Sequence, residues 1–120
     1  MTGDHIEGDV LVLVAAKASV GPQRLPELVD RVAADLRPRR ETYVREYERA
    51  YETDDRTAFF VEDGHWANVR ERLDLGPRQA DAVRRAHHEQ MTRDGRQLDR
   101  TEEFETALEV RDCVVLGTEG

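Results

Sequence analysis

The chain has 120 residues and a formal net charge of −8, with 26 acidic and 18 basic residues. This length suits one domain and is too short for two, so we expect a single domain over residues 9–117 between a flexible tail at 1–8 and a short tail at 118–120. The longest uncharged apolar run is Val10–Ala16. Because a membrane-spanning helix needs roughly 18 such residues, the sequence argues against a membrane protein and a membrane partner.

The first residues also differ from a secretory signal. Asp4 and Glu7 lie where such a signal carries basic residues, so we expect a cytoplasmic location. The single cysteine, Cys113, cannot form an internal disulfide and lies in the apolar run CVVL. We expect it to be a buried, unreactive thiol.

The basic residues are seventeen arginines and one lysine, Lys17. An acidic surface with almost no lysine suits a salt-rich cytoplasm, because about 1 M salt shortens the Debye length to about 3 Å and screens repulsion between carboxylates. A GC-rich genome would also favour arginine codons, but it would not by itself require the acidic excess. The composition therefore favours a halophilic source.

Apolar spacing predicts a mainly α single domain of five or six helices. The clearest helix is Leu25–Leu36, whose apolar residues recur at the i, i+3, i+4 spacing of one helical face. Val10–Ser19 is apolar throughout and fits a strand or a helix, and its alanines favour the helix. Further helices are expected at Arg39–Glu52, after Asp63 through Leu73, at Arg78–Thr92 before an Asp94-Gly95 stop, and at Thr101–Arg111.

Two alternative folds remain open. The three most β-prone runs are Val10–Val14, Ala58–Val61 and Cys113–Leu116, and they would form a small three-stranded sheet in an α+β fold. A winged-helix-like fold is the other alternative, with Arg39–Glu52 as its recognition helix.

Histidines are the first candidates for chemistry. His87 and His88 are adjacent on an expected helix, where His88 shares a face with Asp81, so these three residues are the candidate metal ligands. Adjacent helical side chains diverge by about 100°, which argues against one shared ion. His65 is a candidate general base if Glu62 or Asp63 orients it, although the sequence reveals no nucleophile for it.

Five arginines form the candidate nucleic-acid surface: Arg37, Arg39, Arg40, Arg45 and Arg49. Glutamates interleave with them and would face the phosphates, so Arg–Glu pairs on a solvated helix face are the plainer interpretation. The candidate partner surface is Tyr43, Tyr47 and Tyr51, which recur every four residues. A tyrosine ridge suits an interface, and the alternative is that it packs into the core.

Two segments, AFFVEDGHWANVRERLDLGPRQADAVRRAHHEQM and EEFETALEVRDCVVLG, resemble small uncharacterised proteins of salt-loving archaea, a family of unknown function. The resemblance extends from about Val10 to Gly117 and is vaguer before Phe59. It implies a halophilic archaeal source and a helix-rich fold. It brings no catalytic residue, ligand or activity.

The expected function is a non-enzymatic protein–protein interaction module that associates with a second copy of itself. We expect no cofactor and identify no small-molecule ligand. The first alternative is a winged-helix-type nucleic-acid-binding or regulatory protein. The second is a histidine-based metal-binding or catalytic protein.

Overall fold

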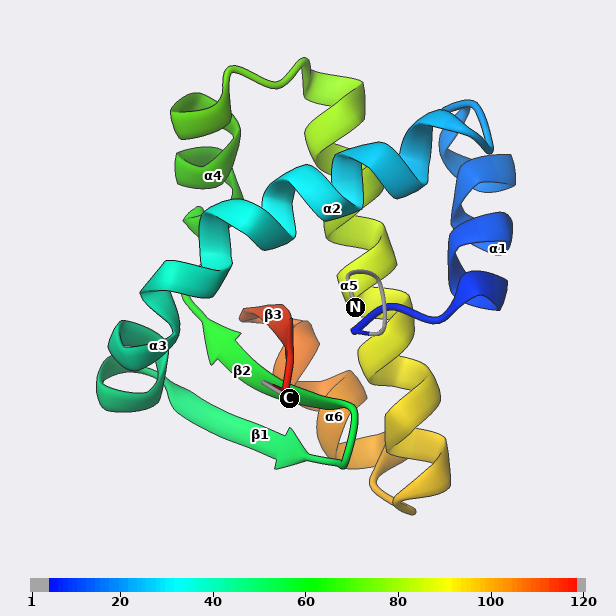
Figure 1. Ribbon diagram of the computed structural model, residues 1–120. Coiled ribbons are helices and arrows are strands. Elements are labelled where there is room, and N and C mark those ends of the chain that lie inside the picture. The colour runs from blue at the N-terminus through cyan, green and yellow to red at the C-terminus, as the bar shows by residue number, and fades with distance from the viewer. Residues whose placement is uncertain (1–4, 119–120) are drawn as a thin grey trace.

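A small antiparallel sheet lies against a set of helices in the computed structural model, which describes residues 5–118 (Figure 1). The helices are α1 (Gly8–Ala18), α2 (Arg24–Leu36), α3 (Arg40–Glu46), α4 (His65–Leu73), α5 (Pro77–Gln97) and α6 (Thr101–Leu108), with a 3₁₀ turn at Arg37–Arg39. The strands are β1 (Glu48–Glu52), β2 (Arg56–Val61) and β3 (Asp112–Gly117).

The sheet has the order β1-β2-β3, and both pairs of strands are antiparallel. β1 and β2 form a hairpin around Thr53–Asp55, whereas β3 joins the other side of β2 from the far end of the chain. All six residues of β2 are buried. The register of the hairpin shifts between Arg49 and Tyr51, so Ala50 forms a bulge.

The fold is therefore helix-rich α+β, and the mainly α prediction was too narrow. Two of the three predicted strands are present, because Ala58–Val61 lies in β2 and Cys113–Leu116 lies in β3. The third was wrong, since Val10–Val14 belongs to helix α1. The preference for a helix at Val10–Ser19 is confirmed.

The predicted helix at Arg39–Glu52 is also wrong over its second half. Helix α3 ends at Glu46, and Tyr47 has extended backbone angles (φ −120°, ψ 153°) that lead into β1. The buried strand β2 needs a hydrogen-bonding neighbour, and the Thr53–Asp55 turn places Glu48–Glu52 alongside it. Pairing with β2 thus outweighs the helical spacing of the three tyrosines.

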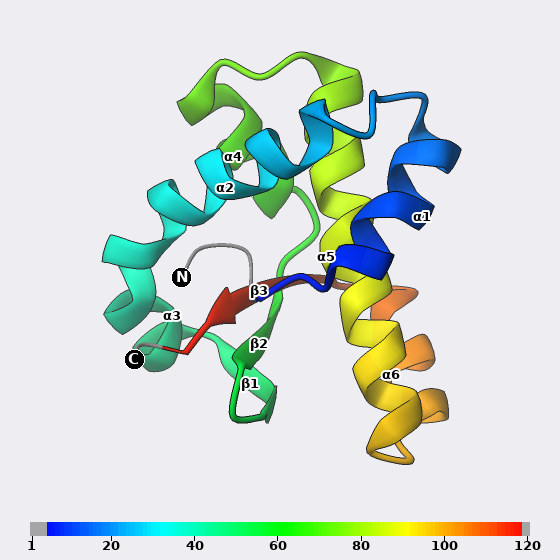
Figure 2. The same ribbon diagram turned by 45° about the vertical axis from the view of Figure 1, so that its right-hand side comes forward.

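Helix α5 is the centre of the fold, because it packs against α1, α2, α4, α6 and β3. Figures 1 and 2 show α1 on the side of α5 away from the sheet. The predicted stop at Asp94-Gly95 lies inside α5. A Cβ at Gly95 would lie 2.7 Å from the Phe104 ring, so this glycine allows α6 to approach α5 closely.

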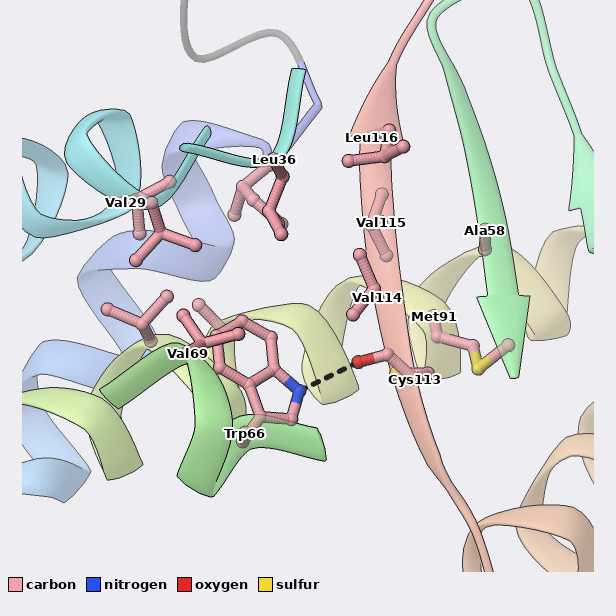
Figure 3. Close-up of a cluster of buried hydrophobic side chains, with 14 of the residues drawn as sticks. Val29, Leu36, Ala58, Trp66, Val69, Met91, Cys113, Val114, Val115 and Leu116 are labelled. Carbon is pink, nitrogen blue, oxygen red and sulfur yellow. Dashed lines mark hydrogen bonds between the residues drawn. The ribbon is translucent and has the colours of Figure 1, made fainter. Parts of the chain in front are cut away.

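The apolar core joins α2, α4 and the sheet. The predicted stripe of α2 is confirmed, since Leu25, Leu28, Val29, Val32 and Leu36 are all buried. Trp66 of α4 lies between the α2 side chains and β3, and its Nε1 donates to the Cys113 carbonyl at 2.9 Å (Figure 3). Burial of each of the α2 side chains contributes about 1.5–3 kcal/mol. The packing of Trp66 between α2 and β3 therefore anchors the sheet to the helices.

The packed part of the chain is longer than predicted. His5 and Ile6 are buried, and the Glu7 amide donates to Oε1 of Gln90 at 2.7 Å, so residues 5–8 are not a flexible tail. The rest of the predicted tail, residues 1–4, lies outside the described residues. At the other end the Thr118 amide donates to the Asp55 carbonyl at 3.0 Å, and residues 119–120 lie outside the described range.

Candidate functional site

A polar cluster at the junction of α5 and β3 is the candidate functional site. A ring nitrogen of His88, Nε2, lies 2.7 Å from Oδ1 of Asp112, and Nε of Arg84 lies 2.7 Å from Oδ2 of the same carboxylate. The backbone amide of Cys113 donates to Oδ1 at 3.0 Å. Ligand atoms of His88, Asp112 and Cys113 lie within 4.8 Å of one another.

The fold positions these residues from two directions. His88 and Arg84 are four residues apart on α5 and therefore share a helix face, which is turned toward the start of β3. Asp112 and Cys113 are the first two residues of β3, and both are buried. The side chains of His88 and Arg84 remain partly exposed.

Electrostatics keep the Asp112 carboxylate ionised. Burial raises its pKa, but hydrogen bonds from His88 and Arg84 outweigh this effect and lower the pKa to about 2. The neighbouring Cys113 has the opposite environment, since burial and the Asp112 charge raise the pKa of its thiol. Cys113 is therefore buried as predicted, and its thiol is not activated as a nucleophile.

A groove of about 180 Å³ between α1 and α5 borders this cluster. His88 belongs to both the groove and the polar cluster, because it lines the groove and contacts Asp112. The remaining lining residues are Leu13, Val14 and Lys17 from α1 and Arg85, Glu89 and Thr92 from α5.

The three predicted metal ligands do not come together. The His87 ring is fully buried, and its Nδ1 accepts a hydrogen bond from the Val115 amide at 2.9 Å. Asp81 pairs with Arg85 at 2.9 Å on its own helix. His88 instead has Asp112 as its partner, which sequence reasoning missed because the two are 24 residues apart; the only signal was an acidic residue directly before the apolar run CVVL.

His65 does acquire partners. The Tyr43 hydroxyl lies 2.5 Å from Nε2 of His65, and Nδ1 of His65 lies 3.2 Å from the Glu62 carboxylate. The sequence offered Glu62 or Asp63 as the carboxylate beside His65, and it could not show that a tyrosine from α3 contacts the other ring nitrogen. Burial raises the pKa of Tyr43, which disfavours a phenolate nucleophile. This hydroxyl–imidazole–carboxylate chain therefore links α3 to α4 without an activated group.

The predicted tyrosine ridge does not exist on one helix. Tyr43 is on α3, Tyr47 follows its end, and Tyr51 is on β1. Tyr43 and Tyr51 are both buried. Tyr51 is buried because β1 directs its side chain toward Asp94 of α5 and Phe104 of α6. The alternative that this stripe packs into the core is correct for these two residues.

Tyr51 belongs to a second buried polar cluster around Asp94. Its hydroxyl donates to Oδ2 of Asp94 at 2.5 Å, and Arg56 contacts both oxygens of that carboxylate at 3.0 and 3.1 Å. Gln90 donates to Oδ1 at 3.1 Å. The cluster joins β1 and β2 to α5, and its buried charges are paired, as burial requires.

The predicted nucleic-acid arginines are spread over several elements. Arg40 donates to the Gly117 carbonyl at 2.8 Å and to Thr57, so it holds the sheet. Arg39, Arg45 and Arg49 pair with Asp35, Glu46 and Glu52, while Arg37 lies in the 3₁₀ turn. Because α3 has only seven residues and Arg49 lies on β1, the expected recognition helix over Arg39–Glu52 is absent from residues 5–118.

Comparisons with known proteins add a family but no activity. No curated protein and no solved structure gives a significant match to this chain. None of the helices within residues 5–118 combines the length and apolar character that a membrane span requires. Residues 4–118 match the family described as Domain of unknown function (DUF8048), and the chain belongs to this family.

Proposed function

We propose that the protein is a non-enzymatic interaction module that associates with a second copy through the outward face of α1. The observation that carries this proposal is Val12, which is 68% exposed in the middle of the most apolar helix. The halophilic archaeal source and cytoplasmic location belong to the same proposal, supported by the acidic, lysine-poor composition.

Helix α1 is apolar on both faces. Val10, Val14 and Ala15 are buried on its inner face, against the rest of the fold. Its outer face carries Val12, Leu13 and Ala16, of which Val12 and Ala16 are exposed. Exposed apolar residues grouped on one helix face mark interaction sites, so the middle of the outer face of α1 favours a partner.

Charge at the two ends of this face makes it complementary to itself. Asp9 and Lys17 share the face with Val12, Leu13 and Ala16, at the i, i+3, i+4, i+7, i+8 spacing. In an antiparallel pair of α1 helices related by a two-fold axis, Asp9 of each copy meets Lys17 of the other. Asp9 is free to do so, since its side chain is 91% exposed and its contact with Arg93 is at 4.0 Å.

The groove between α1 and α5 adds to this surface. Leu13 and Lys17 line the groove as well as the outer face of α1, so an apolar side chain of the second copy can enter the recess beside them. With 11 residues, α1 is about 16 Å long, which gives an interface at the small end of the usual range. We therefore expect a micromolar dissociation constant.

The test is the solution mass across the micromolar range, measured by sedimentation equilibrium in high salt. The wild-type mass should rise from 13.8 kDa toward twice that value. Val12→Asp should remain monomeric with an unchanged unfolding transition. Val44→Asp is the matched control, because Val44 is a similarly exposed valine on α3 and its substitution should leave the dimer intact. A wild-type protein that stays monomeric throughout would overturn the proposal.

A charge exchange tests the antiparallel arrangement. Asp9→Lys and Lys17→Asp should each weaken the dimer. In either variant, residues 9 and 17 carry the same charge, so both of the contacts between the two copies become repulsive. The double variant should restore it, although both substitutions oppose the dipole of α1. If the double variant is weaker than either single variant, the two helices do not pair in this way.

A further inference from the structure

We propose that His88, Asp112 and Cys113 bind a divalent transition-metal ion such as Zn²⁺ at the junction of α5 and β3. One ligand atom from each of the three lies within 4.8 Å of the others. This inference goes beyond the proposed self-association, and the two are tested separately.

The donor set determines the kind of ion. A thiolate, an imidazole and a carboxylate are the ligands of zinc and its neighbours, whereas calcium and magnesium prefer oxygen alone. Bonds of about 2.0–2.3 Å place the ligand atoms around a tetrahedral ion roughly 3.3–3.8 Å apart. The His88–Asp112 contact of 2.7 Å must therefore open slightly, while the Cys113 sulfur moves inward.

Arg84 forms an ion pair with the Asp112 carboxylate and has a second carboxylate, that of Asp81, within reach. Its Nε lies 2.7 Å from Asp112, and its Nη1 lies 3.9 Å from Asp81. The side chain is 39% exposed, so it has room to leave Asp112. An arriving ion would replace the guanidinium charge beside Asp112, and Arg84 would keep an ion pair with Asp81.

Access to the site is through His88. Its side chain is 24% exposed and lines the α1–α5 groove, whereas Asp112 and Cys113 are buried behind it. On binding, the Cys113 thiol would become a thiolate and release its proton to solvent. Three protein ligands leave one position of a tetrahedral ion for another ligand.

The experiment is a Co²⁺ titration of the full-length protein after treatment with a chelator, followed by competition with Zn²⁺. Saturable binding of one ion should produce a thiolate-to-cobalt absorption band. His88→Ala should lower the affinity by more than about 100-fold, since changes outside the ligand shell alone cost about 10- to 100-fold. Glu105→Gln is the control, because Glu105 is an exposed carboxylate on α6 outside this cluster, and it should bind within a few-fold of wild type.

Two further variants separate a metal site from a structural cluster. Cys113→Ser should abolish the absorption band, with circular dichroism to confirm that the variant is folded. Arg84→Gln should tighten binding by about tenfold or more, because the competing charge is removed. Val12→Asp should not change metal affinity, so failure of self-association does not affect this result.

The proposal is overturned if wild type shows no saturable Co²⁺ or Zn²⁺ binding, or if binding occurs without the thiolate band. It is also overturned if His88→Ala binds as tightly as the Glu105→Gln control, because the ion would then lie elsewhere.

Discussion

The two outer edges of the sheet are protected in different ways. On β3, side chains from three helices take the place of a fourth strand: Trp66 donates to the Cys113 carbonyl, His87 accepts from the Val115 amide, and Arg40 donates to the Gly117 carbonyl. On β1, the strand is short, carries a bulge and exposes charged residues, with Arg100 donating to the Ala50 carbonyl.

The difference follows from access to water. The β3 edge is buried, and each unpaired backbone group there would cost about 1–3 kcal/mol, so it needs a specific partner. The β1 edge reaches solvent, where water can satisfy the backbone and charge discourages a second strand. We therefore expect substitutions at the β3 edge to cost stability and those at the β1 edge to cost little.

Trp66→Ala should have the largest effect, a loss of about 3–5 kcal/mol in the free energy of unfolding, because it removes a buried ring and a hydrogen bond together. Trp66→Phe should cost less, since it keeps most of the packing and leaves the Cys113 carbonyl unpaired. Urea unfolding measures both. Equal stability of Trp66→Phe and wild type would show that the hydrogen bond is not needed.

Arg40→Ala should destabilise by about 1.5–3 kcal/mol, because its charged guanidinium holds both the Gly117 carbonyl and Thr57. Arg39→Ala is the control, since Arg39 is largely exposed and its 3.6 Å contact with Asp35 is worth about 1 kcal/mol or less. Urea midpoints should differ in this order. Similar losses for the two variants would argue that the edge contact of Arg40 contributes nothing special.

His87→Leu should change stability by about 1 kcal/mol or less at pH 8, because two effects oppose each other. The variant leaves the Val115 amide unpaired, but it also removes the buried Nε2, which has no hydrogen-bond partner within residues 5–118. A loss as large as that of Trp66→Ala would contradict this cancellation.

The same variant should change the pH dependence. Burial lowers the pKa of His87 well below 6.5, and the nearby His5 and His88 lower it further, whereas Asp112 raises it. The unfolded chain therefore binds a proton below about pH 6.5 that the folded chain does not, so wild-type stability falls as the pH falls. Urea midpoints from pH 8 to pH 5, with chelator present, should decline less in His87→Leu.

Arg100→Ala should have the smallest effect, below about 1 kcal/mol, because water can replace its bond to the Ala50 carbonyl and its pair with Glu103 is exposed. Its contact with the Phe104 ring, 4.6 Å from the guanidinium carbon, adds little at the surface. Thermal unfolding measures the loss. A cost above that of Arg40→Ala would reverse the comparison of the two edges.

Local patterns predicted the elements whose packing is local. The stripe of α2 faces the core because its spacing alone determines that face, and the apolar run of α1 is helical as its alanines suggested. The segment Glu48–Glu52 was predicted wrongly, because its conformation depends on pairing with β2. Tyrosines four residues apart fit a helix equally well when that partner is unknown.

The candidate site was predicted only in part for the same reason. His88 was identified from the sequence, and of the two carboxylates considered for His65, Glu62 and Asp63, the structure places Glu62 beside it. Asp112 was missed, because its hydrogen bonds to His88 and Arg84, 24 and 28 residues away, depend on how α5 and β3 pack. The candidate residue types can be identified from the sequence, but which of them lie close together depends on how the helices and strands pack.

The position of β3 in the chain has a consequence during synthesis. β2 ends at Val61, and its second neighbour begins only at Asp112, after three intervening helices. On a ribosome the hairpin and α4 are made well before β3, so one side of the apolar strand β2 stays unpaired while residues 62–111 are synthesised. We therefore expect β2 to be the segment of the nascent chain that most needs protection by chaperones.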